Sequence, residues 1–262
     1  MAMQLNDTGP LVRKWQIFLQ QQGFYLAAID GIFGVKTKDA TIFFQKFYGI
    51  QPTGIAGSIT LAKAYSLGFN PDNEPPQPII NNDKAMMQWI KNNLGAIIRN
   101  SIINSLFTED MLAGICARET GFLFTRYVNQ QLTFEQIFPL MKGDYGKRKG
   151  DAQKQYHGFG FWQIDIDSYP AFVNSGKWQD PAATAAMAVS VLNSKKAYLE
   201  SRGWNTRLSE AMWERAVIAA YNCGEGNVDK ALSRNMDVDT YTYTKDYSKE
   251  VTRYRIIYAT LA

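Results

Sequence analysis

The order of hydrophobic and polar positions predicts a mainly helical chain. In residues 11–22, 38–48 and 60–67, apolar side chains recur every three or four positions, the spacing that places them on one face of a helix. Short glycine-containing segments separate the second and third stretches from what precedes them. We therefore expect a compact three-helix domain in residues 1–68.

The same turn sequence occurs twice in this domain. Residues 30–37 (DGIFGVKT) and residues 53–60 (TGIAGSIT) carry a Gly-Ile pair, a second glycine and a threonine at matching positions. Glycine adopts backbone angles that other residues resist, so each segment predicts a tight turn that leads into a helix.

A change of composition follows this domain. Residues 69–82 hold four of the nine prolines and no lysine or arginine, which is typical of an extended spacer. The predicted organisation is therefore a first domain in residues 1–68, a proline-rich linker in residues 69–82 and a larger domain in residues 83–262.

The most informative helix of the larger domain is expected to begin after Thr108 and to end at Gly121. Glu119 would then lie at the negative end of the helix dipole and on an apolar face. Both surroundings favour the protonated acid, which is the form that donates a proton to a glycosidic oxygen. Three apolar residues share that face: Leu112, Ile115 and Cys116.

Two further segments present polar side chains. Residues 162–167 alternate and predict a strand with Gln163 and Asp165 on its polar face, beside glycines that leave room for a ligand. Residues 213–221 predict an apolar helix that presents Tyr221 and Asn222 at its end. Taken alone, both segments are also consistent with an ordinary hairpin and an ordinary helix end.

Composition excludes several classes of protein. The chain is 46% hydrophobic and 20% charged, with a net charge of +4 and no long basic stripe, so we expect no nucleic-acid partner. No apolar stretch is long enough to insert into a membrane. His157 is the only histidine, so we expect neither a metal site nor a cofactor, nor a Ser-His mechanism. Whether Cys116 and Cys223 pair is left open.

Residues 5–68 resemble the three-helix peptidoglycan-binding domain of bacterial and phage cell-wall enzymes. The resemblance rests on residues 11–20 (LVRKWQIFLQ) and on the two turns, and it departs from the family at Thr53, where aspartate is usual. It implies a binding groove near the first turn. The candidate wall contacts are Asp30, Phe33, Thr37 and Phe44.

The larger domain resembles the lysozyme-like superfamily of soluble lytic transglycosylases and goose-type lysozymes. Four short motifs occur in that family's order: residues 119–122 (ETGF), 160–165 (GFWQID), 220–228 (AYNCGEGNV) and 246–251 (DYSKEV). The resemblance implies that Glu119 is the general acid. It also implies that Gln163, Tyr221 and Asn222 line the sugar cleft, joined by Tyr247. Nearby aromatic residues either stack on sugar rings or fill the core: Phe122, Trp162, Tyr169 and Trp178.

The second carboxylate is less clearly marked. Goose-type enzymes carry an aspartate that matches Asp165 and an earlier one where this chain has Lys154. Asp151 or Asp144 are candidates for that missing group. A transglycosylase needs no second carboxylate, whereas an inverting hydrolase needs a base across a water molecule from the acid. We favour hydrolysis with Asp165 as the partner.

The expected fold is therefore mainly α: a three-helix peptidoglycan-binding domain and an α+β lysozyme-like domain that is mostly helical with a small β-hairpin. The expected function is that of a modular muramidase, a monomer whose partner is bacterial peptidoglycan. The start of the chain resembles no signal peptide, so we expect a phage endolysin, made in the host cytoplasm and released to the wall by a holin. The alternatives are a lytic transglycosylase, a chitinase-like specificity, a bacterial muramidase exported without a leader and an inactive wall-binding protein.

Overall fold

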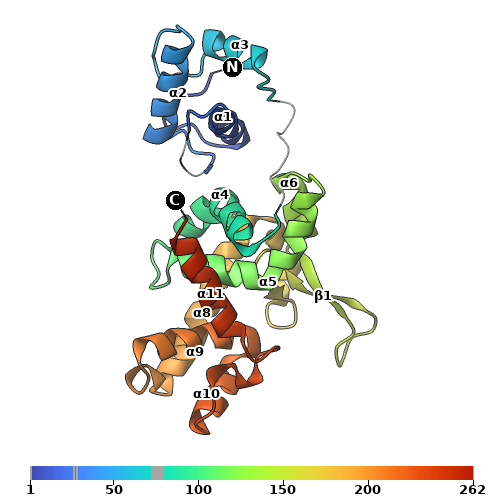
Figure 1. The fold of residues 1–262 in the computed structure, drawn as a ribbon. Helices are drawn as coiled ribbons and strands as arrows, with labels where there is room; N and C mark the ends of the chain where they lie inside the picture. The colour runs from blue at the N-terminus through green and yellow to red at the C-terminus, as the bar shows by residue number, and fades with distance from the viewer. Residues whose placement is uncertain (1, 26, 28, 72–79, 262) are drawn as a thin grey trace. The chain divides into compact units, whose positions relative to one another are not determined.

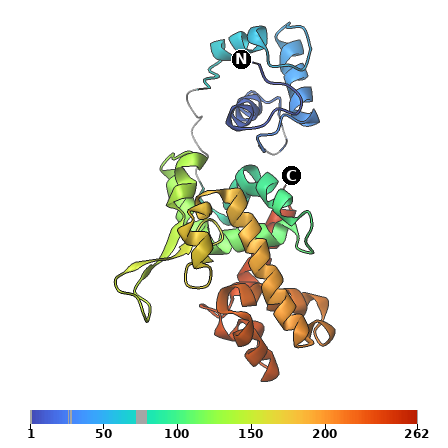
Figure 2. The same ribbon diagram turned by 180° about the vertical axis from the view of Figure 1, so that it is seen from behind.

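The computed structural model describes residues 2–25, 27, 29–71 and 80–261. The chain divides into two compact units, Met1–Pro78 and Ile79–Leu261 (Figure 1, Figure 2). The boundary falls within the predicted linker, of which residues 72–79 lie outside the described residues. Over the described ranges the chain is mainly helical and has one small antiparallel sheet, which confirms the predicted fold class.

The first unit contains three helices close to the predicted positions: α1 (Pro10–Gln21), α2 (Val35–Phe47) and α3 (Ser58–Ser66). Pro10 occupies the first turn of α1, where its missing N–H needs no partner. Backbone bridges from Met3 to Ala56 and from Thr8 to Ile32 join the N-terminal segment to both turns. The unit closes on a core rich in aromatic rings: Trp15, Phe18, Phe33, Phe44 and Phe69.

A buried glutamine from α1 closes the first turn. The Gln16 side-chain oxygen accepts a hydrogen bond from the Gly31 N–H at 2.8 Å. Its amide nitrogen lies 2.7 Å from an Asp30 carboxylate oxygen and 2.9 Å from the Thr37 hydroxyl. Gly31 has a φ of 70°, the left-handed region that favours glycine. The repeated turn residues therefore converge on one amide.

The second turn uses the same arrangement with Gln45 of α2. The Gly54 N–H donates to the Gln45 oxygen at 2.9 Å, and the Gln45 nitrogen donates to the Thr60 hydroxyl at 2.9 Å. The Thr53 hydroxyl takes the place of the Asp30 carboxylate, at 3.3 Å from the same nitrogen. The departure from the family at Thr53 therefore leaves the turn intact.

The second unit is built around α5 (Glu109–Asn129), which packs against α4 (Asp83–Ile102) and α11 (Tyr247–Ala259). Most of the apolar side chains of these helices are buried in one continuous core. The remaining α-helices of the unit are α6 (Phe134–Ile137), α7 (Pro170–Asn174), α8 (Pro181–Ser201), α9 (Glu210–Cys223) and α10 (Glu225–Ser233). Short 3₁₀ turns follow or connect them at Phe138–Leu140, Lys177–Gln179, Trp204–Thr206 and Val238–Tyr241.

The predicted end of α5 at Gly121 is wrong. The helix begins after Thr108 as expected but continues through Gly121 to Asn129. A Cβ atom at position 121 would lie 2.5 Å from the sulfur of Met86 on α4. Gly121 therefore lets two helices approach closely, and Glu119 lies within the helix rather than at its C-terminal end.

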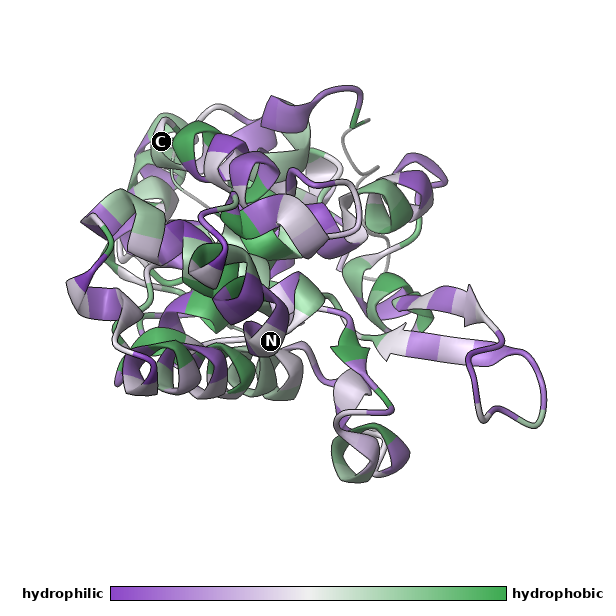
Figure 3. Cartoon of the chain, turned by 90° about the horizontal axis from the view of Figure 1, so that it is seen from below, coloured by the Kyte–Doolittle hydropathy of each residue, from purple (hydrophilic) through white to green (hydrophobic). Residues whose placement is uncertain are grey.

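The sheet consists of β1 (Lys142–Gly146), β2 (Gln155–Phe159) and β3 (Ile164–Asp165), paired antiparallel in that order. The predicted strand over residues 162–167 is reduced to two residues, because Gln163 has a φ of 48° and forms a turn with Gly160. The β1–β2 hairpin stands out from the helices of its unit and is drawn mostly in purple and pale colours (Figure 3). The turn of the hairpin is exposed at residues 147–150 and 152–154, whereas His157 and Gly158 of β2 are buried.

Candidate functional site

A cavity of about 670 Å³ in the second unit is lined by side chains from α5, the sheet, α8, α9 and the start of α11. These elements are far apart in the sequence, and the fold brings them to one place. Nine of the twelve residues named as candidates for catalysis or sugar contact line the cavity: Glu119, Phe122, Asp144, Gln163, Asp165, Tyr169, Tyr221, Asn222 and Tyr247.

Glu119 reaches the cavity from the middle of α5. Its partly buried carboxyl group accepts a hydrogen bond from the Tyr247 hydroxyl. Burial raises the pKa of Glu119 to about 7, against the opposing effects of the Tyr247 hydrogen bond and the Arg118 charge. We predicted a raised pKa from burial and from the helix dipole. Only burial remains as its cause, because α5 continues past Gly121 and Glu119 does not lie at the helix end.

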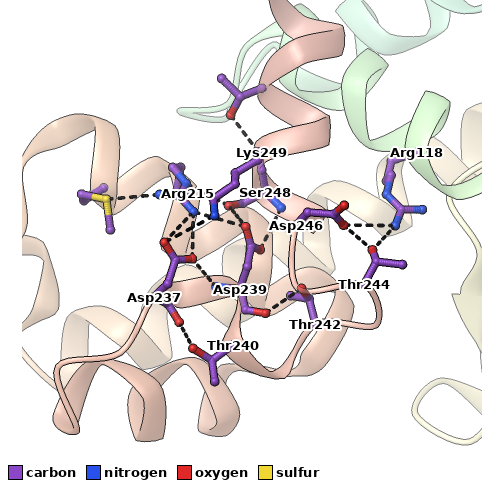
Figure 4. A network of polar contacts seen from close by, with 12 residues as sticks. Arg118, Arg215, Asp237, Asp239, Thr240, Thr242, Thr244, Asp246, Ser248 and Lys249 are labelled. Atoms are coloured by element: carbon purple, nitrogen blue, oxygen red, sulfur yellow. Dashed lines mark hydrogen bonds and ion pairs between the residues drawn. The ribbon is translucent and has the colours of Figure 1, made fainter.

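A polar network at the start of α11 (Figure 4) adjoins Tyr247, whose hydroxyl bonds to Glu119. The Asp239 carboxylate is fully buried and accepts hydrogen bonds from the Ser248 N–H at 2.9 Å and the Ser248 hydroxyl at 2.7 Å. Arg215 donates to the same carboxylate at 3.2 Å. Because Ser248 follows Tyr247 directly, this network fixes the position from which the tyrosine reaches the acid.

Arg118 contacts the residues that directly precede α11 (Figure 4). Its guanidinium donates to the Thr244 hydroxyl at 2.7 Å and lies 3.8 Å from the Asp246 carboxylate. It also lies over the Tyr247 ring, 5.4 Å from the ring centre. Arg118 lines the cavity, although the sequence analysis did not select it.

Gln163 fills space that two glycines leave open. A Cβ atom at Gly143 or Gly158 would come within 2.1 or 2.4 Å of the Gln163 side-chain oxygen. The Gln163 nitrogen donates to the Gly160 carbonyl at 2.9 Å. We expected Gly158 and Gly160 to make room for a ligand. Gly158 lines the cavity and also makes room for Gln163, whereas Gly160 makes room for Thr184 on α8.

Asp165 enters the cavity from β3. One carboxylate oxygen accepts a hydrogen bond from Arg148 at 2.5 Å, and the other accepts one from the Ser168 N–H at 2.9 Å. Partial burial acts to raise the pKa of Asp165, but the bonds from Arg148 and Ser168 outweigh it and hold that pKa below its ordinary value. The pKa values of Glu119 and Asp165 are thus shifted in opposite directions.

Tyr221 and Asn222 lie at the end of α9, as predicted, just before Gly224, whose φ is 84°. The Tyr221 hydroxyl donates to the Trp162 carbonyl at 2.8 Å. The Asn222 side-chain oxygen accepts from the Tyr243 N–H at 3.1 Å. These bonds join the end of α9 to the turn between β2 and β3 and to the segment before α11.

Three candidate site residues, Trp162, Trp178 and Asp151, do not line this cavity in the described part of the chain. Trp178 is buried and packs edge-on against the Phe159 ring. Trp162 is fully buried, and its ring nitrogen donates to the Leu112 carbonyl at 2.9 Å, so it belongs to the core. Asp151 lies in the turn of the hairpin, 2.8 Å from the buried His157 ring nitrogen. Cys116 and Cys223, whose pairing the sequence left open, are both free thiols.

Three of the four candidate wall contacts of the first unit are buried, and the fourth, Asp30, is partly exposed. Phe33 and Phe44 have no exposed surface, Thr37 is 1% exposed, and Asp30 is bound to Gln16 and to the Ile32 N–H. A shallow hollow of about 520 Å³ lies elsewhere on this unit. Its lining residues are Gly23, Phe24, Phe43, Lys46 and Phe47.

Comparison with known proteins supports the assignment of the first unit. Residues 8–63 match the family described as putative peptidoglycan binding domain, so the first unit carries a domain of that family. A stretch of 71 residues is 37% identical to the N-acetylmuramoyl-L-alanine amidase CwlM of Mycobacterium tuberculosis. It covers 27% of this chain and 18% of that protein, so the chain spans less than one fifth of the relative's length.

Among solved structures, the crystal structure of a Burkholderia AP3 phage endolysin aligns over 100% of both chains, with 16% sequence identity and a TM-score of 0.31. A likeness at this level does not establish a shared fold. In the described ranges, no helix combines the length and the apolar character needed to cross a membrane.

Proposed function

We propose that the protein is a muramidase that binds bacterial peptidoglycan through its first unit. Its second unit would cut the bond between N-acetylmuramic acid and N-acetylglucosamine. The observation that carries this proposal is the pair of carboxyl groups in one cavity, Glu119 with its pKa raised to about 7 and Asp165 with its pKa lowered. Glycosidases need one carboxyl group that keeps its proton and one that has lost it.

In the proposed reaction, Glu119 gives its proton to the glycosidic oxygen as the bond to the anomeric carbon breaks. Water attacks that carbon from the other face of the sugar, and the ionised Asp165 accepts the proton that the water loses. Tyr247 orients Glu119 through its hydrogen bond. Gln163, Tyr221 and Asn222 offer hydrogen bonds to the sugar from the cavity wall.

The wall-binding unit would serve to keep the catalytic unit near an insoluble polymer. We assign its contact with peptidoglycan to the hollow at Phe43 and Phe47, because these rings are 60% and 71% exposed and Lys46 lies beside them. Aromatic faces pack against sugar rings, and a lysine attracts the carboxylates of the wall peptides. We also propose that the protein is a phage endolysin that reaches the wall through a holin.

Mass spectrometry of the fragments released from purified peptidoglycan tests the chemistry. Fragments with a reducing N-acetylmuramic acid end are expected from a muramidase. Fragments about 18 Da lighter, through loss of water into a 1,6-anhydro ring, would instead identify a lytic transglycosylase. Peptides released from an intact glycan would instead identify an amidase, the activity named for the Mycobacterium tuberculosis relative. The absence of any released material would indicate a protein that only binds the wall.

A further inference from the structure

A single arginine on the exposed hairpin binds three carboxylates beside the cavity. Arg148 lies in the turn between β1 and β2, and its guanidinium contacts Asp144 at 2.5 Å, Asp165 at 2.5 Å and Asp167 at 2.7 Å. The oxygens of Asp165 and Asp167 share one nitrogen of Arg148. Isolated surface ion pairs contribute little, but a guanidinium shared among three carboxylates forms a network with fixed geometry.

The turn is built to present this arginine. The Arg148 N–H donates to the Asp151 carboxylate at 2.6 Å, and the Asp151 N–H donates back to the Arg148 carbonyl at 3.1 Å. The buried His157 ring then contacts Asp151 through one nitrogen at 2.8 Å and the Asp144 carbonyl through the other at 2.9 Å. Asp151, which the sequence suggested as a catalytic base, thus anchors the turn that carries Arg148.

The three carboxylates would repel one another without the arginine. Asp165 and Asp167 both bind the same nitrogen and are therefore close neighbours, and Asp144 binds the adjacent nitrogen. Like charges at such distances favour protonation of one member of the group. Removal of Arg148 would leave Asp165 with its Ser168 hydrogen bond and two negative neighbours.

We propose that Arg148 is a positioning residue that keeps Asp165 ionised and aimed into the cavity while Glu119, in the same cavity, keeps its proton. This inference rests on the proposed function. It adds the residue that keeps one carboxyl group ionised while the other keeps its proton. Arg148 acts through Asp165 and does not itself take part in the reaction.

The other charged and titratable groups around Asp165 come from several elements. Arg118 and Glu119 face the cavity from α5, and Lys195 faces it from α8, where it pairs with Glu225 at 2.6 Å. The remaining groups are Asp144 on β1, Asp151 and His157 on the hairpin, Asp167 after β3, and the hydroxyls of Tyr169, Tyr221 and Tyr247. Among these, Arg148 is the cation that contacts Asp165 in the described structure.

The pH dependence of peptidoglycan hydrolysis tests the inference. In Arg148→Gln, we expect the acidic limb of kcat/KM to move toward neutral pH by about one unit, because Asp165 would protonate more readily. Activity should fall by up to about tenfold at acidic pH values below the midpoint of that limb and change little near neutral pH, while the basic limb, set by Glu119, should stay in place. Arg148→Lys keeps the positive charge but loses the paired N–H donors of the guanidinium, so its acidic limb should lie between those of the wild type and Arg148→Gln.

The matched control is Lys149→Gln, which removes the same charge from the neighbouring exposed position. We expect its pH profile to match that of the wild type. An equal shift in Lys149→Gln, or a loss in Arg148→Gln that is the same at every pH, would overturn the inference and leave the proposed function standing. A wild-type protein that releases no fragments would overturn both.

A direct titration measures the effect of Arg148 on the Asp165 carboxyl group without relying on activity. Carbon-13 NMR of the carboxyl groups in a Glu119→Gln background should show a higher pKa for Asp165 when Arg148 is replaced by Gln. An unchanged Asp165 titration in a variant that unfolds at the same temperature as its parent would contradict the role of Arg148.

Discussion

Gln16 and Gln45 of the first unit and Glu119 of the second unit are inward-facing polar side chains in opposite situations. In the first unit, Gln16 and Gln45 are buried and use both ends of their amides, so each holds a turn in place. In the second unit, Glu119 faces a cavity, and burial raises its pKa to about 7. A satisfied neutral group stabilises a fold, whereas a titratable group facing a cavity is available for chemistry.

The strongest test of this contrast is Glu119→Gln. The amide cannot donate the proton of the carboxylic acid, so hydrolysis of peptidoglycan should fall by about 10²–10⁴-fold while wall binding is retained. Lysis of a cell-wall suspension and co-sedimentation with peptidoglycan measure the two properties. Glu135→Gln, at an exposed position, is the control. Full lysis by Glu119→Gln would remove the central claim of the proposal.

The matching change in the first unit is Gln16→Leu. It leaves the Gly31 N–H and the Asp30 carboxylate without the amide that now bonds to them, which should lower the free energy of unfolding of this unit by about 2–4 kcal/mol. Denaturant unfolding of the full chain measures the loss. Gln45→Leu should have a similar effect at the second turn, and neither should alter the pH profile of hydrolysis. An unaffected Gln16→Leu protein would show that the amide does not hold the turn.

Glu119→Gln should also change stability in a pH-dependent way. Between pH 4.5 and about 7 the folded wild-type chain keeps a proton that the unfolded chain loses, so the stability contributed at this site falls as pH rises. The glutamine variant avoids this loss and should be more stable than the wild type by about 1–3 kcal/mol above pH 7. Thermal unfolding from pH 4 to pH 8 measures the difference, which should vanish at the acidic end. A constant difference would show that Glu119 titrates normally.

The smallest expected effect concerns wall binding. Phe47→Ala removes an exposed ring from the hollow and should weaken retention on peptidoglycan by about 3- to 10-fold without changing stability. Ile59→Ala is the control, because Ile59 on α3 is 72% exposed and lies outside the residues that line the hollow. Sedimentation of the full chain with the Glu119→Gln change avoids digestion of the wall. Equal retention of both variants would place the contact elsewhere.

Local features of the fold could be predicted from the sequence because they depend on neighbouring residues. The three helices of the first unit, the start of α5 and the end of α9 follow from apolar spacing and from glycine. Gly121 shows the limit of that argument. The same residue type ends a helix or admits a neighbouring helix, and the difference depends on Met86, which is distant in the sequence.

The arrangement of the site depended on long-range contacts that no local pattern contains. The motifs selected Glu119 and Asp165 correctly as lining one cavity, but they did not indicate that Tyr247 bonds to the acid. Arg148 lies in a short basic run, residues 147–149, and no local pattern marks it as the partner of Asp165. Phe33 and Phe44 were expected to face a ligand, and only the packing of the core shows that they do not.

The paired turns of the first unit have a consequence for sequence divergence. Asp30 and Thr53 occupy equivalent positions and bind the same kind of amide, although one is an acid and the other a neutral alcohol. The turn requires only a side chain at this position that can accept a hydrogen bond from the amide nitrogen of the buried glutamine. Mutation can therefore add or remove a negative charge in a turn while the module keeps its shape, so the net charge of the domain can change without a change of fold.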